Sequence, residues 1–221
     1  EDVQLAARPV TVSTLEVTDL RHDGDVTDVD VRVVCSSGTY VRALARDAGS
    51  ARWFAKDAAF DRAFTDRCCD SHYAAARREL DHWIETPEAA LALIILLDQL
   101  PRNAFRDTAH MFATDPLALG FSKEAIQQDH DRKINPELRA FMLMPLMHSE
   151  TLDDQEQLLT LLNPETETET YRFAIIHRDI IARFGRFPHR NACLARPTSE
   201  DEAEFLRSDG PGRRFGEESG R

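Results

Sequence analysis

The alternation of hydrophobic and polar residues changes its period near residue 50. In residues 29–33, valine occupies every second position, with polar residues between. This is the period of a strand with one buried face. A similar run covers residues 10–17, with a slip near Thr14, and the polar turn R-H-D-G-D separates the two runs. The pattern predicts a β-hairpin, followed by a short helix with Leu44 and Ala48 on one face.

Helical signals begin at residue 51. Three expected helix starts place a capping side chain directly before proline: Thr86-Pro87, Asp115-Pro116 and Asn135-Pro136. Such a side chain accepts hydrogen bonds from the first turn, where proline has no N–H to leave unpaired. Residues 199–202, S-E-D-E, read as a capping box. We expect helices over 57–69, 72–84, 87–100, 116–128, 136–147, 151–162, 169–184 and 199–207.

The composition is typical of a soluble globular protein, with 42% hydrophobic and 30% charged residues. The net charge is −12; residues 1–50 hold nine acidic and five basic residues, a net −4, so the rest carries −8. An acidic chain is a poor non-specific binder of nucleic acid. No apolar run has the roughly 18 residues of a membrane helix, and no signal peptide is expected. The four cysteines form no C-x-x-C pair, which favours free thiols and a cytoplasmic location.

The first fifty residues carry a specific motif. A-R-P-V-T-V-S precedes V-D-V-R-V-V-C-S-S-G-T-Y-V-R-A-L-A-R-D-A-G. With these motifs, residues 6–49 resemble the TruB-type tRNA pseudouridine synthases. The resemblance implies that Tyr40 packs beside the target uracil and that Arg42 pairs with the nucleophilic aspartate. Both roles make chemical sense, because stacking holds a flipped base and a fixed cation keeps an aspartate ionised.

The catalytic aspartate of that family lies in a G-x-L-D motif upstream of this strand, where the present sequence has only a few residues. Leu80-Asp81, Leu97-Asp98 and Leu152-Asp153 all lack the preceding glycine. We therefore expect no pseudouridine synthase activity, and we interpret the fragment as an inactive remnant packed on another domain. Residual RNA binding through Tyr40 and Arg42, and complementation by another chain, are the alternatives.

Three longer motifs lie downstream: L-I-I-L-L-D-Q-L-P-R-N-A-F-R at 93–106, P-L-M-H-S-E-T-L-D-D-Q-E at 145–156, and H-R-D-I-I-A-R-F-G-R-F-P-H-R-N at 177–191. With them, residues 51–207 resemble the bacterial family called domain of unknown function 924. The resemblance implies a helical fold similar to tetratricopeptide-repeat proteins. The family normally begins with an apolar, tryptophan-containing helix, and here the TruB-like fragment stands in its place.

The expected fold class is therefore mainly α, a tetratricopeptide-like antiparallel helical array with a short N-terminal β-hairpin plus helix fragment. The expected domains are a TruB-like fragment over 1–50, a helical domain over 51–207 and a flexible tail over 208–221. Two proteins would thus meet near residues 49–52. A natural fusion, a gene-assembly error and a misassembled sequence all fit this pattern.

The same three motifs concentrate charge beside apolar helices. Asp98 ends a helix that is apolar nearly all round, so burial requires an arginine partner. His148 lies at an expected bend, where it either ends a helix or serves a site, and His177 borders an apolar stripe, where it is either a core residue or a ligand-binding one. The loop over 183–191 gathers arginines whose planar forks suit carboxylate or phosphate groups.

Three functions follow as hypotheses. The first is a cytoplasmic binding protein for a small anionic ligand or an acidic peptide; its binding residues would be Asp98, Arg102, Asn103, Arg106, His148, Glu150, His177, Arg186, His189, Arg190 and Asn191. The second is a hydrolase with His148 or His177 as general base and Arg186 as anion stabiliser; Glu150 is a further catalytic candidate. The third is RNA binding or tRNA pseudouridine synthesis inherited from the fragment, although the missing aspartate motif argues against the synthesis. We expect no cofactor and no metal, no membrane partner and no tRNA partner, and the oligomeric state stays open.

Overall fold

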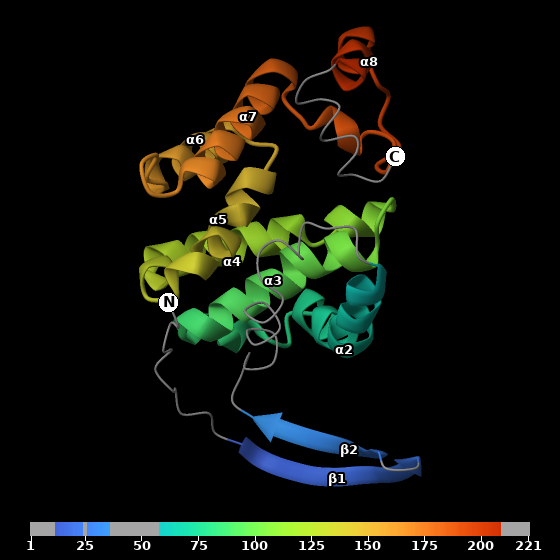
Figure 1. Ribbon diagram of the computed structural model, residues 1–221. Helices are drawn as coiled ribbons and strands as arrows, with labels where there is room; N and C mark the ends of the chain where they lie inside the picture. The colour runs from blue at the N-terminus through green and yellow to red at the C-terminus, as the bar shows by residue number, and fades with distance from the viewer. Residues whose placement is uncertain (1–11, 24–25, 36–57, 209–221) are drawn as a thin grey trace.

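The structure of the protein is a computed structural model that describes residues 12–23, 26–35 and 58–208. The described part is mainly helical, as expected (Figure 1). Its α-helices are α2 (Ala58–Ala76), α3 (Pro87–Ala104), α4 (Asp115–Gln127), α5 (Pro136–His148), α6 (Leu152–Leu161), α7 (Thr168–Phe184) and α8 (Glu200–Arg207). Short 3-10 helices connect them: η1 (Asp81–Glu85), η2 (Ala109–Phe112), η3 (His130–Arg132) and η4 (Pro188–Arg190).

Two antiparallel strands precede the helices. They are β1 (Val12–Asp23) and β2 (Val26–Cys35), paired so that Leu15 lies opposite Val33. The register is irregular at two places, between Val12 and Thr14 and between Val17 and Asp19. The first irregularity coincides with the slip in the alternation near Thr14. A bulge of this kind lets a strand keep its pairing where the two-residue period is interrupted.

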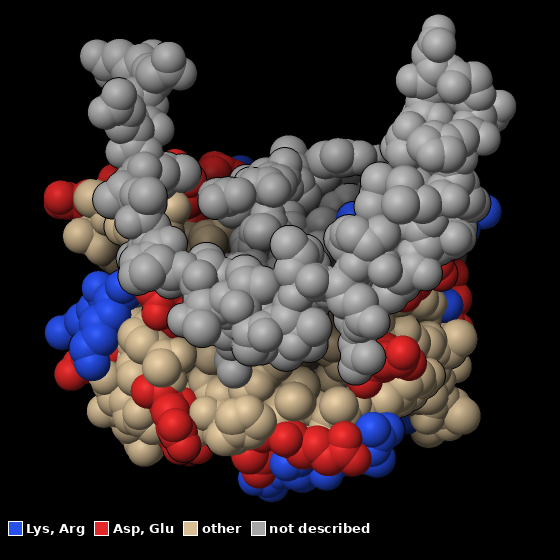
Figure 2. Space-filling model, turned by 90° about the horizontal axis from the view of Figure 1, so that it is seen from below, with Lys and Arg blue, Asp and Glu red and all other residues tan. Residues whose placement is uncertain are grey.

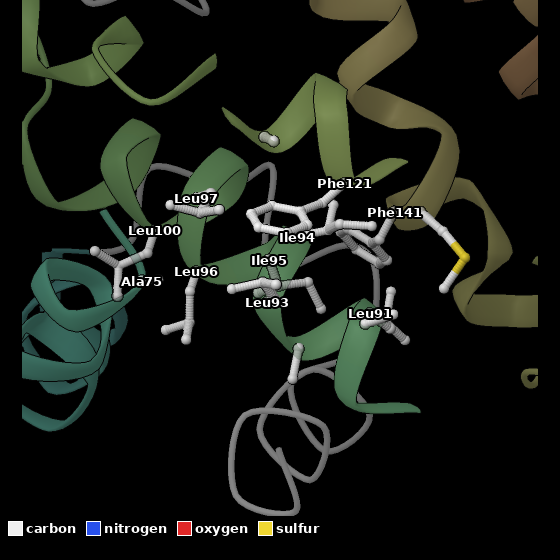
Figure 3. Close-up of a cluster of buried hydrophobic side chains, with 14 of the residues drawn as sticks. Ala75, Leu91, Leu93, Ile94, Ile95, Leu96, Leu97, Leu100, Phe121 and Phe141 are labelled. Carbon is white, nitrogen blue, oxygen red and sulfur yellow. The ribbon is translucent and has the colours of Figure 1, made fainter. Parts of the chain in front are cut away.

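Helix α3 forms the centre of the hydrophobic core. Every residue from Ala89 to Pro101 is buried, as its nearly continuous apolar sequence predicts. Figure 3 shows Ala75 of α2, Phe121 of α4 and Phe141 of α5 gathered around its leucines and isoleucines. Burying side chains of this size stabilises the fold by about 1.5–3 kcal/mol each. The core therefore fixes the position of α3, and with it the polar residues at the end of α3.

Proline does not end α3 where the sequence suggested. The expected helix stopped at residue 100, but α3 continues through Pro101 to Ala104. Proline lacks the N–H that would bond to the carbonyl oxygen four residues earlier, which is that of Leu97. The Thr114 hydroxyl supplies the missing bond, donating to the Leu97 oxygen at 2.5 Å. The prediction was wrong because a residue from another element compensates for the proline.

The expected break at residues 70–71 was also wrong. A single helix, α2, spans this position and ends at Ala76. His72 is buried there and its Nδ1 donates to the Leu96 carbonyl oxygen of α3 at 2.9 Å, so the segment expected to be a turn packs on the core. The chain then turns at Arg78, whose φ is 66°, and residues 81–85 form η1 rather than the end of a second helix.

The helix caps follow the sequence only in part. Asn135 accepts from the Glu137 N–H at 3.0 Å, and Ser199 and Glu202 form the expected capping box. Thr86 makes no side-chain cap bond. The carboxylate of Asp115 binds two arginines, and Asp115 is itself the first residue of α4. The cap expected at Asp115 is therefore replaced by ion pairs.

The C-terminal half has two smaller apolar clusters. Leu146, Leu158 and Ala174 join α5, α6 and α7, and Ile180, Ile181 and Phe187 join α7 to η4. No helix of the described residues is both long and apolar enough to cross a membrane.

The surface mixes charges of both signs. On the face shown in Figure 2, acidic (red) and basic (blue) side chains lie next to one another. Exposed pairs such as Arg78 with Asp81, 2.7 Å apart, belong to this pattern. Exposed pairs contribute about 0–1 kcal/mol each. They keep charges of opposite sign close together.

Candidate functional site

A buried carboxylate lies at the end of α3. Asp98 is fully buried, and one carboxylate oxygen, Oδ1, is 2.7 Å from His148 Nδ1 and 3.2 Å from Arg102 Nη1. The other, Oδ2, accepts from Gln99 Nε2 at 2.6 Å. Burial alone would raise the pKa of Asp98, but Arg102 and His148 hold it well below its usual value. Asp98 is therefore ionised. The sequence predicted an arginine partner without choosing among Arg102, Arg106, Arg186 and Arg190, and in the structure the partner is Arg102.

A second carboxylate joins two arginines from distant parts of the chain. Arg102 donates to both oxygens of Asp115, at 2.8 and 2.9 Å, in the bidentate geometry of a guanidinium. Arg190 of η4 donates to the same carboxylate at 3.2 Å, and its Nη2 donates to the His148 carbonyl oxygen at 3.0 Å. The site therefore brings together the end of α3, the start of α4, the end of α5 and η4.

Arg190 is a buried cation with unused donors. Its side chain is 8% exposed and its guanidinium lies over the rings of Phe112 and Phe187, 4.7 and 4.6 Å from their centroids. Within the described part of the chain it makes two of the five hydrogen bonds that its N–H groups allow, and its Nε has no partner there. Burial lowers the pKa of Arg190 to about 10, with Asp115 opposing the shift. A buried donor without a partner costs stability, which a bound acceptor would restore.

Three histidines of the motifs are held neutral. Burial, followed by the charge of Arg102, lowers the pKa of His148 in spite of Asp98. Burial lowers the pKa of His177 to about 3, although its Nδ1 donates to the Phe173 carbonyl oxygen at 2.8 Å. Burial also lowers the pKa of His189 well below its usual value. The rings of His177 and His189 both contact the ring of Phe187, with 5.5 Å between the ring centroids in each pair.

A family model described as a bacterial protein of unknown function, DUF924, matches residues 39–210. The chain belongs to the DUF924 family. A solved structure, the protein of unknown function ATU0120 from Agrobacterium tumefaciens, is 48% identical with a TM-score of 0.74. The match covers 77% of this chain and 96% of that one. The helical fold described above is thus shared with a relative of known structure.

The chain also matches curated proteins, some at high identity over a short stretch and one at lower identity over most of its length. A tRNA pseudouridine synthase B of Corynebacterium glutamicum is 63% identical over 51 residues, 23% of this chain and 17% of that protein. The enzyme of the same name from Cutibacterium acnes is 31% identical over 175 residues, 79% of this chain and 52% of that protein. The chain thus covers about a sixth of the first relative's length and half of the other's. The TruB-like resemblance is confirmed, and Tyr40 and Arg42, which carry it, lie outside the described residues.

Other predicted residues of the DUF924 motifs make separate interactions. Arg186 pairs with Glu202 at 2.6 Å, a carboxylate whose pKa it lowers to about 2, and Asn191 donates to the same carboxylate at 3.3 Å. This group ties η4 to the capping box of α8. Arg186 and Arg190 are four residues apart in sequence, yet they bind different acidic residues.

Two further predicted site residues, Arg106 and Glu150, form ion pairs of their own. Arg106 donates to Asp61 of α2 at 3.1 Å and to Asn103 at 3.0 Å. Glu150 accepts from Arg196 at 2.7 Å and from the Phe187 N–H at 2.8 Å, and these donors with Arg190 lower its pKa against the effect of burial. The network around Asp98 therefore contains Arg102, His148 and Arg190, with His177 and His189 reaching it through Phe187.

Sequence reasoning missed Asp115 and Phe112. Asp115 was interpreted as a helix cap because it precedes proline, and its neighbours in sequence gave no sign of an arginine partner. Phe112 lies in a connecting segment outside the three motifs, yet its ring contacts both Arg102 and Arg190. A cluster of three or more metal-binding side chains was not found among the described residues.

Proposed function

We propose that the protein binds a small anionic ligand at Arg190, Arg102 and His148. The observation that carries the proposal is the guanidinium of Arg190, which is nearly buried, lies over the rings of two phenylalanines, and has an N–H group without an acceptor in the described part of the chain. Bidentate and charge-assisted bonds to a carboxylate or phosphate are the strongest that such a group can make. An acidic peptide that presents a carboxylate would use the same donors.

The polar side chains at the edge of this network are partly accessible. The side chains of Arg102, Asp115 and His148 are 14%, 17% and 15% exposed, while Asp98 behind them is fully buried. A ligand would thus approach from the side of Arg102 and His148. Asp98 would hold both residues in place, and Arg190 would supply further donors.

Calorimetric titration of the full chain with phosphate, sulfate, acetate and glycolate tests the proposal. We expect Arg190→Gln to weaken binding of the best anion at least about tenfold, the loss of roughly one charge-assisted bond. Arg186→Gln is the matched control, because Arg186 pairs with Glu202 instead. Arg190→Lys keeps the charge but loses the fork, and serves if Arg190→Gln does not fold. Equal affinity of wild type and Arg190 variants, or no binding of any anion, would overturn the proposal.

The Asp98–His148 pair supports a second candidate, a hydrolase. A histidine 2.7 Å from an ionised carboxylate is oriented as a general base. The carboxylate partner is Asp98, whereas Glu150, another catalytic candidate from the sequence, binds Arg196. Release of nitrophenol from p-nitrophenyl acetate or phosphate would be expected to disappear in His148→Asn and to persist in His82→Asn, since His82 is exposed on η1. Equal rates in wild type and His148→Asn would contradict this candidate.

The N-terminal fragment carries a separate proposal. Identity of 63% to a tRNA pseudouridine synthase B over 51 residues supports residual RNA binding by Tyr40 and Arg42, on a fragment fused to the helical domain. tRNA affinity should then fall steeply with salt and be lost in the Tyr40→Ala, Arg42→Ala variant. Salt-independent or absent tRNA binding would favour an inert remnant.

Two structural expectations belong with these proposals. Helices α6 and α7 pack together across a short connection, which supports a tetratricopeptide-like arrangement. The free cysteines among the described residues, Cys68, Cys69 and Cys193, support a reducing, cytoplasmic location.

A further inference from the structure

The candidate site contains hydrogen-bond acceptors beside its donors. Asp98 and Asp115 are carboxylates within the same network as Arg102 and Arg190. The two negative and two positive charges cancel, so the network attracts an anion through directed N–H groups more than through net charge. Any ligand that contacts the arginines also lies close to hydrogen-bond acceptors of the network. Whether the ligand carries a proton therefore affects its affinity as much as its charge does.

The geometry of Asp98 fixes the proton of His148. Oδ1 of an ionised carboxylate can only accept, so His148 Nδ1, 2.7 Å away, must donate. A neutral imidazole carries one N–H, which places the lone pair on Nε2. The His148 side chain is only partly buried. His148 thus presents Nε2 as an acceptor, and Arg102 binds the same Asp98 oxygen as Nδ1 of this ring.

The geometry points to a ligand group that is both anionic and protonated, as in dihydrogen phosphate or a phosphomonoester monoanion. Its ionised oxygens accept from Arg102 and Arg190, and its P–O–H donates to His148 Nε2. This inference rests on the proposed anion binding and deepens it by naming the class of ligand. Sulfate has the same shape but no proton to donate near neutral pH. It would leave Nε2 without a partner and bring a second negative charge beside Asp98 and Asp115.

A site built to accept a hydrogen bond rejects the analogue that lacks the donor, because its own polar group is then left unpaired. We expect phosphate to bind the full chain at least about tenfold more tightly than sulfate at pH 6.5, where phosphate keeps a proton. Acetate, which also has no proton to donate, should resemble sulfate. Arsenate, protonated like phosphate, should resemble phosphate.

His148→Gln provides the decisive variant. A glutamine amide can turn either its oxygen or its N–H₂ group toward the ligand, so it serves protonated and unprotonated anions alike. The phosphate-to-sulfate ratio should fall toward one in this variant. In Arg186→Gln the ratio should stay as in wild type, because Arg186 is paired with Glu202. Far-UV circular dichroism and Tm establish that each variant is folded; His148→Asn replaces His148→Gln if that variant is not.

The outcomes separate the two proposals. The inference is supported if wild type binds phosphate tightly and sulfate weakly, and if the ratio of the two affinities falls toward one in the His148 variant. Equal binding of phosphate and sulfate, preference for acetate, or an unchanged ratio in the His148 variant overturns the inference and leaves anion binding in place. Absence of binding by every anion overturns both.

Discussion

The two ends of α3 are buried in different ways. From Ala89 to Leu97 the helix is surrounded by apolar side chains of α2, α4 and α5. One residue later the chain buries Asp98, and the surroundings become ion pairs and histidines. Both regions exclude water, but the first gains from every apolar neighbour, whereas the second depends on particular partners at particular distances.

The difference shows what each kind of burial requires. Apolar packing is non-directional, so a neighbouring leucine can often be exchanged at moderate cost. A buried charge costs solvation energy that only a correctly placed opposite charge or hydrogen bond offsets. For the removal of a similar number of side-chain atoms, the apolar end of α3 is therefore expected to lose less unfolding free energy than the polar end.

The largest effect is expected from Asp98→Ala. It leaves His148 Nδ1 and Gln99 Nε2 without their acceptor. It also removes one of the carboxylates that pair with the charge of Arg102. We expect a loss of about 4 kcal/mol in unfolding free energy, within the range for breaking a buried ion pair. Urea denaturation measures it, with Asp179→Ala, in an exposed pair with Arg178, as control. A loss near 1 kcal/mol would mean that the polar end tolerates substitution as well as an exposed position does.

A somewhat smaller effect is expected from Leu93→Ala. Leu93 is fully buried in the apolar cluster, and truncation removes transfer energy and leaves a cavity. The expected loss is about 3 kcal/mol. Leu152→Ala, at a position 37% exposed, should change stability by less than about 0.5 kcal/mol in the same denaturation assay. Similar losses at both positions would contradict the central place given to α3.

The third prediction concerns pH. His177 has a pKa of about 3 in the folded protein and 6.5 as an ordinary histidine. As pH falls below about 6.5 the unfolded chain takes up the proton first, so stability is present above that pH and is lost progressively toward pH 3. Between pH 7 and pH 5 this histidine should cost about 2 kcal/mol of unfolding free energy. His177→Gln should flatten the slope of stability against pH by that amount; an unchanged slope would show that His177 is protonated in the folded state.

The smallest prediction separates a helix cap that forms from one that does not. Asn135→Ala removes the bond to the Glu137 N–H and should cost about 1 kcal/mol. Thr86→Ala removes a side chain that makes no cap bond and should change stability by less than about 0.5 kcal/mol. Thermal unfolding of the two variants side by side measures the difference. Equal shifts in Tm would show that the proline alone starts both helices.

The sequence allowed prediction of those features that depend on local pattern. The burial of α3, the bounds of α7 and the capping box at Ser199 follow from periodicity and cap chemistry. The partners of charged residues could not be predicted in the same way. Arg186 and Arg190 look alike in sequence but bind Glu202 and Asp115 respectively, because η4 turns the chain between them.

The partner of His148 was likewise beyond local pattern. Asp98 and His148 are fifty positions apart, and Glu150 was the nearer carboxylate in sequence. Only the packing of α5 against α3 brings His148 Nδ1 to Asp98, while Glu150 faces Arg196. Long-range pairing of this kind is a property of the assembled helices, so the composition of the site could be predicted more completely than its connections.

The proline inside α3 has a consequence for how α4 is placed. Because Pro101 has no N–H, the Leu97 oxygen is left for Thr114, and the residue after Thr114 is Asp115. The Thr114 hydroxyl therefore fixes the start of α4 against α3, and this sets the distance from Arg102 to the carboxylate of Asp115. Substituting alanine for Pro101 would return an N–H to the Leu97 oxygen and make the threonine redundant. Thr114→Ala should thus cost more stability with Pro101 in place than in the Pro101→Ala background, a coupling that a double-mutant cycle would measure.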